Sequence, residues 1–140
     1  MTENQQKADK YLMRIRNADR DMRIMFEKIQ FLRYKASGMG AIRYDKDHVQ
    51  TSPEDMVCAA IAEAVALEDR LRDRDRQRHE AIERTTGIIQ LWDDKYARAI
   101  ETYYVNRGSM TDVARHCGCS GRNAYRIKLE ALTRFAQYLV

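Results

Sequence analysis

A cluster of basic side chains lies near the C-terminal end of the sequence. Residues 106–128 contain four arginines and one lysine against a single aspartate, which gives this stretch a net charge of +4. An arginine guanidinium can donate two parallel hydrogen bonds to guanine in the major groove of DNA, and both arginine and lysine bind phosphates. These residue types therefore predict a surface that binds double-stranded DNA.

The first element that would position these side chains is a short helix over residues 110–116. Ser109 and Asp112 have the spacing of a capping box, in which each side chain accepts a hydrogen bond from the backbone of the other. Before this helix, Asn106 to Gly108 interrupts an apolar helical pattern over residues 94–105. Gly118, in the sequence Cys117-Gly118-Cys119, suits the positive φ at which helices commonly end.

A second helix is expected over residues 121–138, with Ser120 as its N-cap. Two helices joined by a three-residue turn with a central glycine form a helix-turn-helix, in which the start of the second helix enters the major groove. Its outward side chains are the predicted base contacts: Arg122, Asn123, Tyr125 and Arg126. The predicted phosphate contacts are Arg107, Arg115, Ser120, Gly121 and Lys128.

The rest of the sequence predicts two long helices. In the first, over residues 8–35, apolar residues recur in steps of four and three, as in a coiled coil: Tyr11, Ile15, Ala18, Met22, Met25, Ile29 and Leu32. Ser52-Pro53 starts the second, over residues 53–80, after a connector at 36–52. Its apolar stripe is Val57, Ile61, Ala64, Val65 and Leu71.

The fold class is therefore all-α. We expect an antiparallel helical hairpin over residues 1–80 and a helix-turn-helix domain over residues 81–140, with Trp92 as an anchor between them. The heptad pattern fits the core of this hairpin, and it also fits a coiled coil between two chains, so a homodimer through the hairpin is an alternative. The arginine-rich run Arg70–Arg78 fits a solvated helix face better than a second nucleic-acid contact.

The segment IETYYVNRGSMTDVARHCGCSGRNAYRIKLEAL (residues 100–132) resembles the helix-turn-helix of region 4 in sigma factors. The chain as a whole resembles the RinA/ArpU type of phage and prophage transcriptional regulators, which also carry an N-terminal helical hairpin. This resemblance implies activation of phage late genes together with host RNA polymerase. Tyr103, Arg107 and Ala124 depart from the residues usual at their positions.

The sequence contains few residues that could support enzyme chemistry. It has no phosphate-binding glycine loop, no nucleophile elbow and no HExxH motif, so we expect no enzyme and no cofactor. His116, Cys117 and Cys119 have no second ligand pair nearby, and small buried cysteines explain them better than a zinc site. Three cysteines without a disulfide pattern, and no apolar signal segment or membrane span, predict a cytoplasmic protein. The resemblance to phage regulators implies a bacterial host cell.

Two other functions fit the same pattern. Small terminase-like DNA-packaging proteins of phages also join a helix-turn-helix to helical oligomerisation elements, although theirs is typically N-terminal. A helical protein-interaction module with a degenerate helix-turn-helix is the other alternative. A ring of many subunits would favour a packaging protein over a regulator. A lack of salt-dependent binding to DNA would favour an interaction module.

Overall fold

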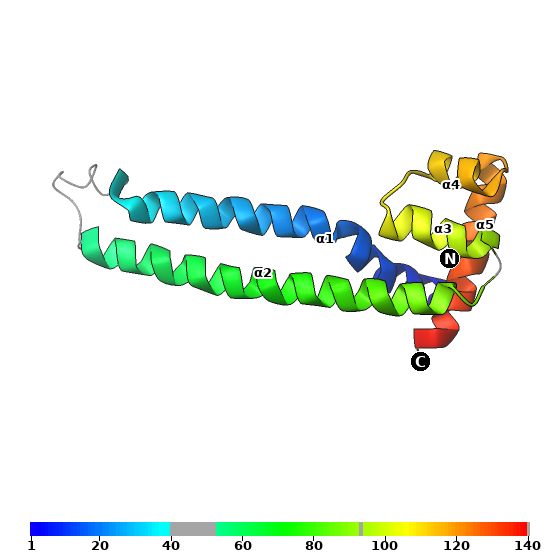
Figure 1. Ribbon diagram of the computed structural model, residues 1–140, viewed down its shortest axis with the longest axis horizontal. Coiled ribbons are helices and arrows are strands. Elements are labelled where there is room, and N and C mark those ends of the chain that lie inside the picture. The colour runs from blue at the N-terminus through cyan, green and yellow to red at the C-terminus, as the bar shows by residue number, and fades with distance from the viewer. Residues whose placement is uncertain (40–52, 93, 140) are drawn as a thin grey trace. The chain divides into compact units, whose positions relative to one another are not determined.

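The computed structural model describes residues 1–39, 53–92 and 94–139, and it confirms the all-α class, because the described residues form helices and turns and no strand. No described helix is both long and apolar enough to cross a membrane. The helices are labelled in Figure 1: α1 (Glu3–Tyr34), α2 (Pro53–Ile89), α3 (Asp94–Ile100), α4 (Met110–Cys117) and α5 (Gly121–Ala136). Short π-helical segments follow α1 (Lys35–Met39) and α3 (Glu101–Val105), and a 3-10 turn follows α5 (Gln137–Leu139).

The helix boundaries agree with the predicted ones to within two residues at most ends, but α1 begins at Glu3, five residues before the predicted start at 8. Helix α2 begins at Pro53 as predicted, but it continues through Gly87 to Ile89, nine residues beyond the predicted end at 80. Helix α5 ends at Ala136, slightly before the predicted 138. The predicted Ser52 cap and most of the predicted connector lie outside the described residues.

The chain folds into two compact units. The first, here called the terminal unit, combines Met1–Asp19 with Gln77–Val140, and the second, the middle unit, is Arg20–Arg76. This division differs from the predicted boundary after residue 80. The reason is that the start of α1 is part of the core formed by the C-terminal helices, since Ala8 and Leu12 are fully buried there.

The core of the terminal unit contains residues of α1, α2, α3 and α5 and of the π-helical segment Glu101–Val105. Its buried members are Ala8, Leu12, Ile15, Ile88, Ile89, Ile100, Tyr104, Ala131, Leu132 and Phe135. Leu12 is buried where the heptad placed Tyr11, which is only partly buried against the same core. Trp92 contacts this core edge-to-face, with its ring centroid 6.4 Å from that of Phe135. Trp92 is partly buried against this core, and its role as an anchor between the two predicted domains stays a prediction.

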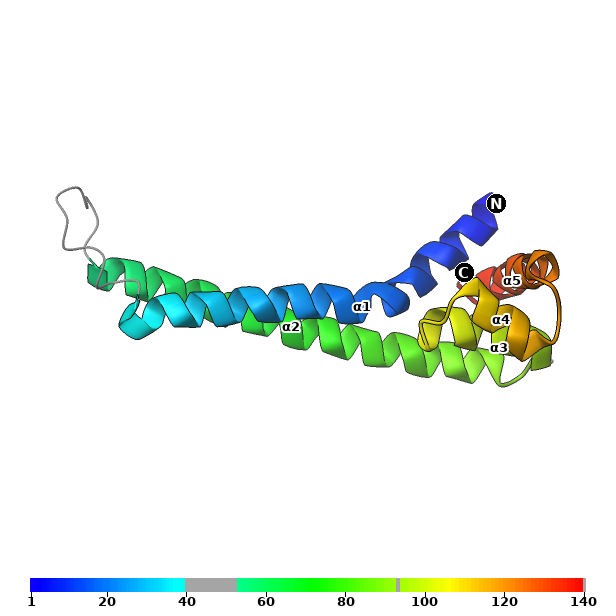
Figure 2. The same cartoon turned by 90° about the horizontal axis from the view of Figure 1, so that it is seen from above.

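In the middle unit, α1 and α2 run side by side in opposite directions (Figures 1 and 2). Five apolar residues are buried between them: Ile29, Leu32, Ala60, Ala64 and Leu67. The predicted stripe on α2 was partly wrong, because Ile61 and Val65 are 49% and 47% exposed. Ala64 is buried against α1 as predicted, and Ala60 and Leu67 lie there in place of Ile61 and Val65. Ion pairs such as Arg74–Asp21 (2.6 Å) flank the contact.

Candidate nucleic-acid interface

Helix α4 begins with the predicted capping box. The Asp112 amide donates to Ser109 Oγ (3.2 Å), and the Ser109 amide donates to Asp112 Oδ2 (2.9 Å). The backbone hydrogen bond from Ser109 is the main reason that the pKa of the Asp112 carboxyl lies below its ordinary value. On the side of α4 that faces α3 and α5, Val113 is completely buried. Helix α4 is therefore fixed at its start by polar contacts and along its inner side by packing.

The turn between α4 and α5 uses a left-handed glycine. Gly118 has φ 64° and ψ 39°, and the Cys119 amide donates to the carbonyl of Ala114 (3.0 Å). Cys117 and Cys119 are partly buried against Val113 and its neighbours, and burial raises the pKa of the Cys117 thiol. Both thiols are free, and the described residues contain no group of three side chains able to hold a metal.

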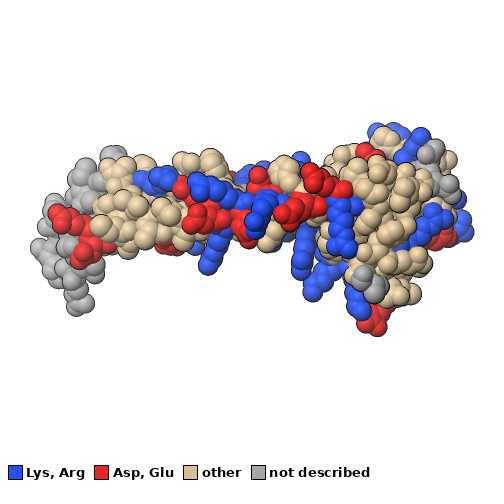
Figure 3. Space-filling view, turned by 60° about the horizontal axis from the view of Figure 1, so that its bottom comes forward, with Lys and Arg blue, Asp and Glu red and all other residues tan. Residues whose placement is uncertain are grey.

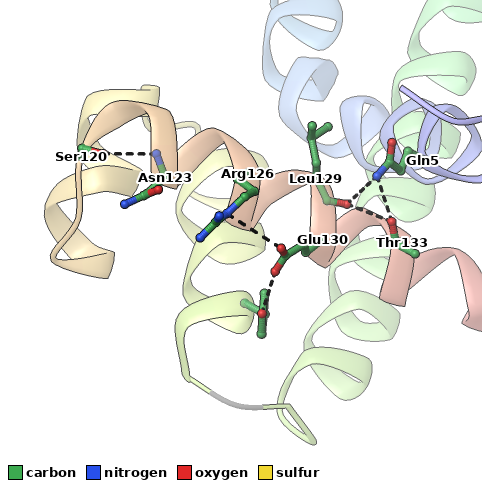
Figure 4. A network of polar contacts seen from close by, with 8 residues as sticks. Gln5, Ser120, Asn123, Arg126, Leu129, Glu130 and Thr133 are labelled. Carbon is green, nitrogen blue, oxygen red and sulfur yellow. Dashed lines mark hydrogen bonds and ion pairs between the residues drawn. The ribbon is translucent and has the colours of Figure 1, made fainter.

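Helix α5 separates its inward and outward side chains within its first two turns. Ser120 caps it by accepting the Asn123 amide (3.3 Å; Figure 4), and Ala124 and Ile127 are buried against α3 and α4. The four side chains predicted to contact bases are all exposed: Arg122, Asn123, Tyr125 and Arg126. The structure thus brings these four together on the outer side at the start of α5.

The two arginines of this set are held differently. Arg126 lies 4.0 Å from Glu130, which in turn accepts a hydrogen bond from the Tyr96 hydroxyl (2.8 Å); Figure 4 shows both contacts beside the labelled Arg126 and Glu130. Arg122 makes no hydrogen bond or ion pair to any described residue. A ligand can therefore engage Arg122 without breaking an existing contact.

Four of the five predicted phosphate contacts fall into two groups. Arg115, Ser120 and Gly121 are exposed, and the last two lie at the N-terminus of α5, where free backbone N–H groups and the helix dipole favour anions. Arg107 is instead paired with Asp19 (2.6 Å) and has φ 58°, a conformation that costs a non-glycine residue about 1–2 kcal/mol. Arg107 is thus anchored as well as exposed.

The predicted phosphate contact of Lys128 requires a correction. Lys128 is only 6% exposed, and its ammonium lies over the rings of Tyr103 (4.0 Å to the centroid), Tyr104 (5.7 Å) and Tyr125 (5.8 Å). Burial lowers its pKa, with the nearby Asp9 acting in the opposite direction. A side chain enclosed in this way does not reach a phosphate, so its role is packing.

Sequence reasoning missed the support that the start of α1 gives to this surface. Arg16 donates to the carbonyls of Tyr103 (2.5 Å) and Gly108 (2.7 Å), which holds the segment leading into α4. Gln5 donates to the Leu129 carbonyl (3.1 Å) and the Thr133 hydroxyl (2.9 Å) of α5, as Figure 4 shows. No local signal identifies these residues, because their partners lie about ninety or more positions away in the sequence.

Two further hydrogen bonds hold the residues that surround α4 and α5. The Tyr104 hydroxyl donates to Asp9 (2.5 Å), and burial together with this bond raises the pKa of Tyr104 far above its ordinary value. Arg98, an exposed arginine on α3, donates to the carbonyl of His116 at the end of α4 (3.4 Å). Arg98 is a basic side chain beside α4 that the sequence analysis did not include.

Comparison with protein-family models, with curated proteins and with solved structures gives no match to this chain.

Proposed function

We propose that the protein is a sequence-specific regulator of transcription that binds double-stranded DNA through α4 and α5, acting as a helix-turn-helix. The observation that carries this proposal is the arrangement at the start of α5. Arg122, Asn123, Tyr125 and Arg126 are exposed together, while Ala124 and Ile127 between them are buried. A recognition helix needs this separation, because one side must pack on the domain while the other reads base edges.

The chemistry of the exposed side chains suits base recognition. An arginine such as Arg122 can bind guanine bidentately, and Asn123 can bind adenine in the same manner. The N-terminus of α5 and the exposed Arg115 of α4 supply phosphate contacts, which set the register of a protein on DNA without reading sequence. Base-reading and phosphate-binding groups are thus adjacent, as in known complexes of this kind.

The biological role rests on the resemblance to RinA/ArpU-type regulators. In this proposal the protein activates phage late genes together with host RNA polymerase, in the cytoplasm of a bacterial host. The two long helices serve as a helical hairpin that carries the DNA-binding helices and offers a surface to partners.

Selection from a random duplex library, followed by anisotropy titration of the selected and a scrambled duplex, tests the proposal. We expect a preference of about 10³-fold or more for the selected duplex and a steep loss of affinity with salt. Replacement of Arg122 or Arg126 with alanine should cost about 1–3 kcal/mol each on the selected duplex. The absence of any preference would refute sequence-specific binding.

Two further variants sharpen the assignment. R122K keeps the charge but loses the bidentate fork, so it should weaken binding to the selected duplex and leave binding to the scrambled duplex nearly unchanged. R14A removes an exposed arginine of α1 and serves as the matched control, which should bind both duplexes as the unmodified chain does. Equal losses from R14A and R122A would indicate general electrostatic attraction instead of base reading.

A further inference from the structure

The middle unit leaves much of its apolar surface uncovered. Ile24, Phe26 and Phe31 of α1 are between 52% and 59% exposed, and Ile61 and Val65 of α2 are about half exposed. Figure 3 shows a broad area without charged side chains toward the left end of the two long helices. A pair of helices leaves one side of each helix uncovered, and exposed large apolar side chains gathered on such a unit are typical of an interaction site.

A groove lies on one side of the middle unit, between α1 and α2. Its volume is about 490 Å³. It is lined by three apolar residues, Met22, Phe26 and Leu71, and by three charged ones, Arg23, Arg72 and Asp75. A groove with apolar and charged lining suits a pair of aliphatic side chains carried by a helix.

A ridge of the matching kind follows the same side of α2. Ile61 and Val65 lie one helical turn apart, and the spacing of four and three residues continues through Glu68 to Arg72 and Asp75. Arg72 and Asp75 line the groove, so the ridge and the groove lie on one side of α2, about 10–15 Å apart along the helix. A partner that carries an equivalent ridge and groove in the opposite order along its helix would fill this groove and accept this ridge at the same time.

The charges of α2 are arranged with a similar polarity. Residues 53–69 contain five acids and no lysine or arginine, whereas residues 70–76 contain four arginines and two aspartates. Two copies of α2 placed antiparallel bring the acidic part of each against the basic part of the other. A parallel pair would place like charges together, which opposes association.

We propose that the middle unit binds a second copy of the same chain, with the two α2 helices antiparallel around a two-fold axis near Glu68. In this interface Ile61 and Val65 of each copy enter the groove at Met22, Phe26 and Leu71 of the other. Every contact then occurs twice, as a closed two-fold dimer requires. Glu68 is already paired with Arg33, which limits repulsion between the two copies of Glu68 at the axis.

The mass of the full chain in solution without DNA tests this dimer, independently of whether the chain binds DNA. Light scattering after size exclusion should give about twice the 16.5 kDa of one chain. The I61Q/V65Q variant should raise the dimer dissociation constant about 100-fold, about tenfold for each lost anchor. A chain that stays monomeric at about 100 µM, well above the micromolar dissociation constants of ordinary interfaces, overturns the proposal.

The matched control is I24Q/F31Q, which removes two equally exposed apolar side chains that do not line the groove. It should dimerise like the unmodified chain, and all replaced residues are exposed, so circular dichroism should show an unchanged helix content. If I24Q/F31Q dissociates the dimer and I61Q/V65Q does not, the proposed interface is wrong.

Disulfide trapping tests the antiparallel direction. Cys58 is exposed and free, and Arg76 lies eighteen residues further along α2. These positions share one side of the helix but are about 27 Å apart, too far for a disulfide within one chain. Oxidised R76C should therefore form a covalent dimer, and C58S/R76C, which keeps Cys117 and Cys119, should not. A covalent dimer in that control, or one through Cys58 in the unmodified chain, overturns the antiparallel arrangement.

Discussion

The terminal and middle units contain parts of the same two long helices but are stabilised in different ways. In the terminal unit, side chains from four helices enclose Leu12, Tyr104 and Phe135 completely, and polar side chains of α1 bond to backbone carbonyls. In the middle unit only two helices meet, the buried residues are few and include alanines, and exposed ion pairs flank them. The terminal unit is therefore stabilised by a core shared among four helices, and the middle unit by a narrow contact between two helices.

The largest expected difference comes from the same substitution made in both cores. Leu12→Ala removes a fully buried leucine from the terminal unit and should cost about 3–5 kcal/mol. Leu67→Ala, at a residue 9% exposed in the smaller core, should cost about 2–3 kcal/mol. Hydrogen exchange read separately for each unit measures the two losses, because the units need not unfold together. Equal losses would contradict the contrast between the units.

Polar contacts should likewise contribute more to stability in the terminal unit than in the middle unit. Arg16→Ala removes two partly buried hydrogen bonds to the carbonyls of Tyr103 and Gly108, and hydrogen bonds from a charged group contribute about 1.5–3 kcal/mol. Arg33→Ala removes an exposed ion pair with Glu68 in the middle unit and should cost about 0.2–1 kcal/mol. Urea unfolding of both variants tests this order. We also expect Arg16→Ala to weaken DNA binding, because α4 would lose its support.

The parts of the fold that the sequence predicted are those that depend on local spacing. The capping box of Ser109, the left-handed Gly118 and the cap of Ser120 were all predicted from residues within three positions of their partners. The exposure of Arg122 and Arg126 followed from the same helical periodicity.

The features that the sequence did not predict depend on contacts distant in the chain. Lys128 has an ordinary surface residue type, and only the folded arrangement of Tyr103, Tyr104 and Tyr125 encloses it. The membership of residues 1–19 in the terminal unit rests on pairs such as Tyr104–Asp9. In the middle unit, the side of α2 that carries Ala60 and Leu67 faces α1, although Ile61 and Val65 are more hydrophobic than the alanines.

Within the terminal unit, replacement of two glycines by alanine should change stability by smaller amounts and in opposite directions. Gly118→Ala places a β-carbon at φ 64°, where nothing lies within 4 Å, so the cost of about 1–2 kcal/mol is purely conformational. Gly87→Ala in the last turn of α2 also meets no neighbour and should stabilise by about 0.5 kcal/mol, the lower end of the range for a mid-helix glycine. Thermal unfolding compares the two variants. A stabilising Gly118→Ala would contradict the left-handed turn between α4 and α5.

The smallest effect is expected for Lys128→Met, which tests whether a buried charge matters for the terminal unit. The ammonium loses hydration but gains attraction to three tyrosine rings, and these opposing effects should leave the change near neutral pH within about 1 kcal/mol. Binding to the selected DNA duplex should not change, in contrast to Arg122→Ala. A loss of affinity equal to that of Arg122→Ala would mean that Lys128 contacts a DNA phosphate after all.

The pH dependence of the same variant gives an independent check. The pKa of Lys128 is lowered in the folded chain, so the unfolded chain binds this proton more tightly. Stability therefore rises as the pH increases through the folded pKa toward the ordinary lysine value of about 10.4, and the gain is absent below that range. Lys128→Met should remove this alkaline gain, which urea unfolding at neutral pH and near pH 10 measures against the unmodified chain. An unchanged alkaline slope would mean that the ammonium is solvated and that the rings of Tyr103 and Tyr104 do not enclose it.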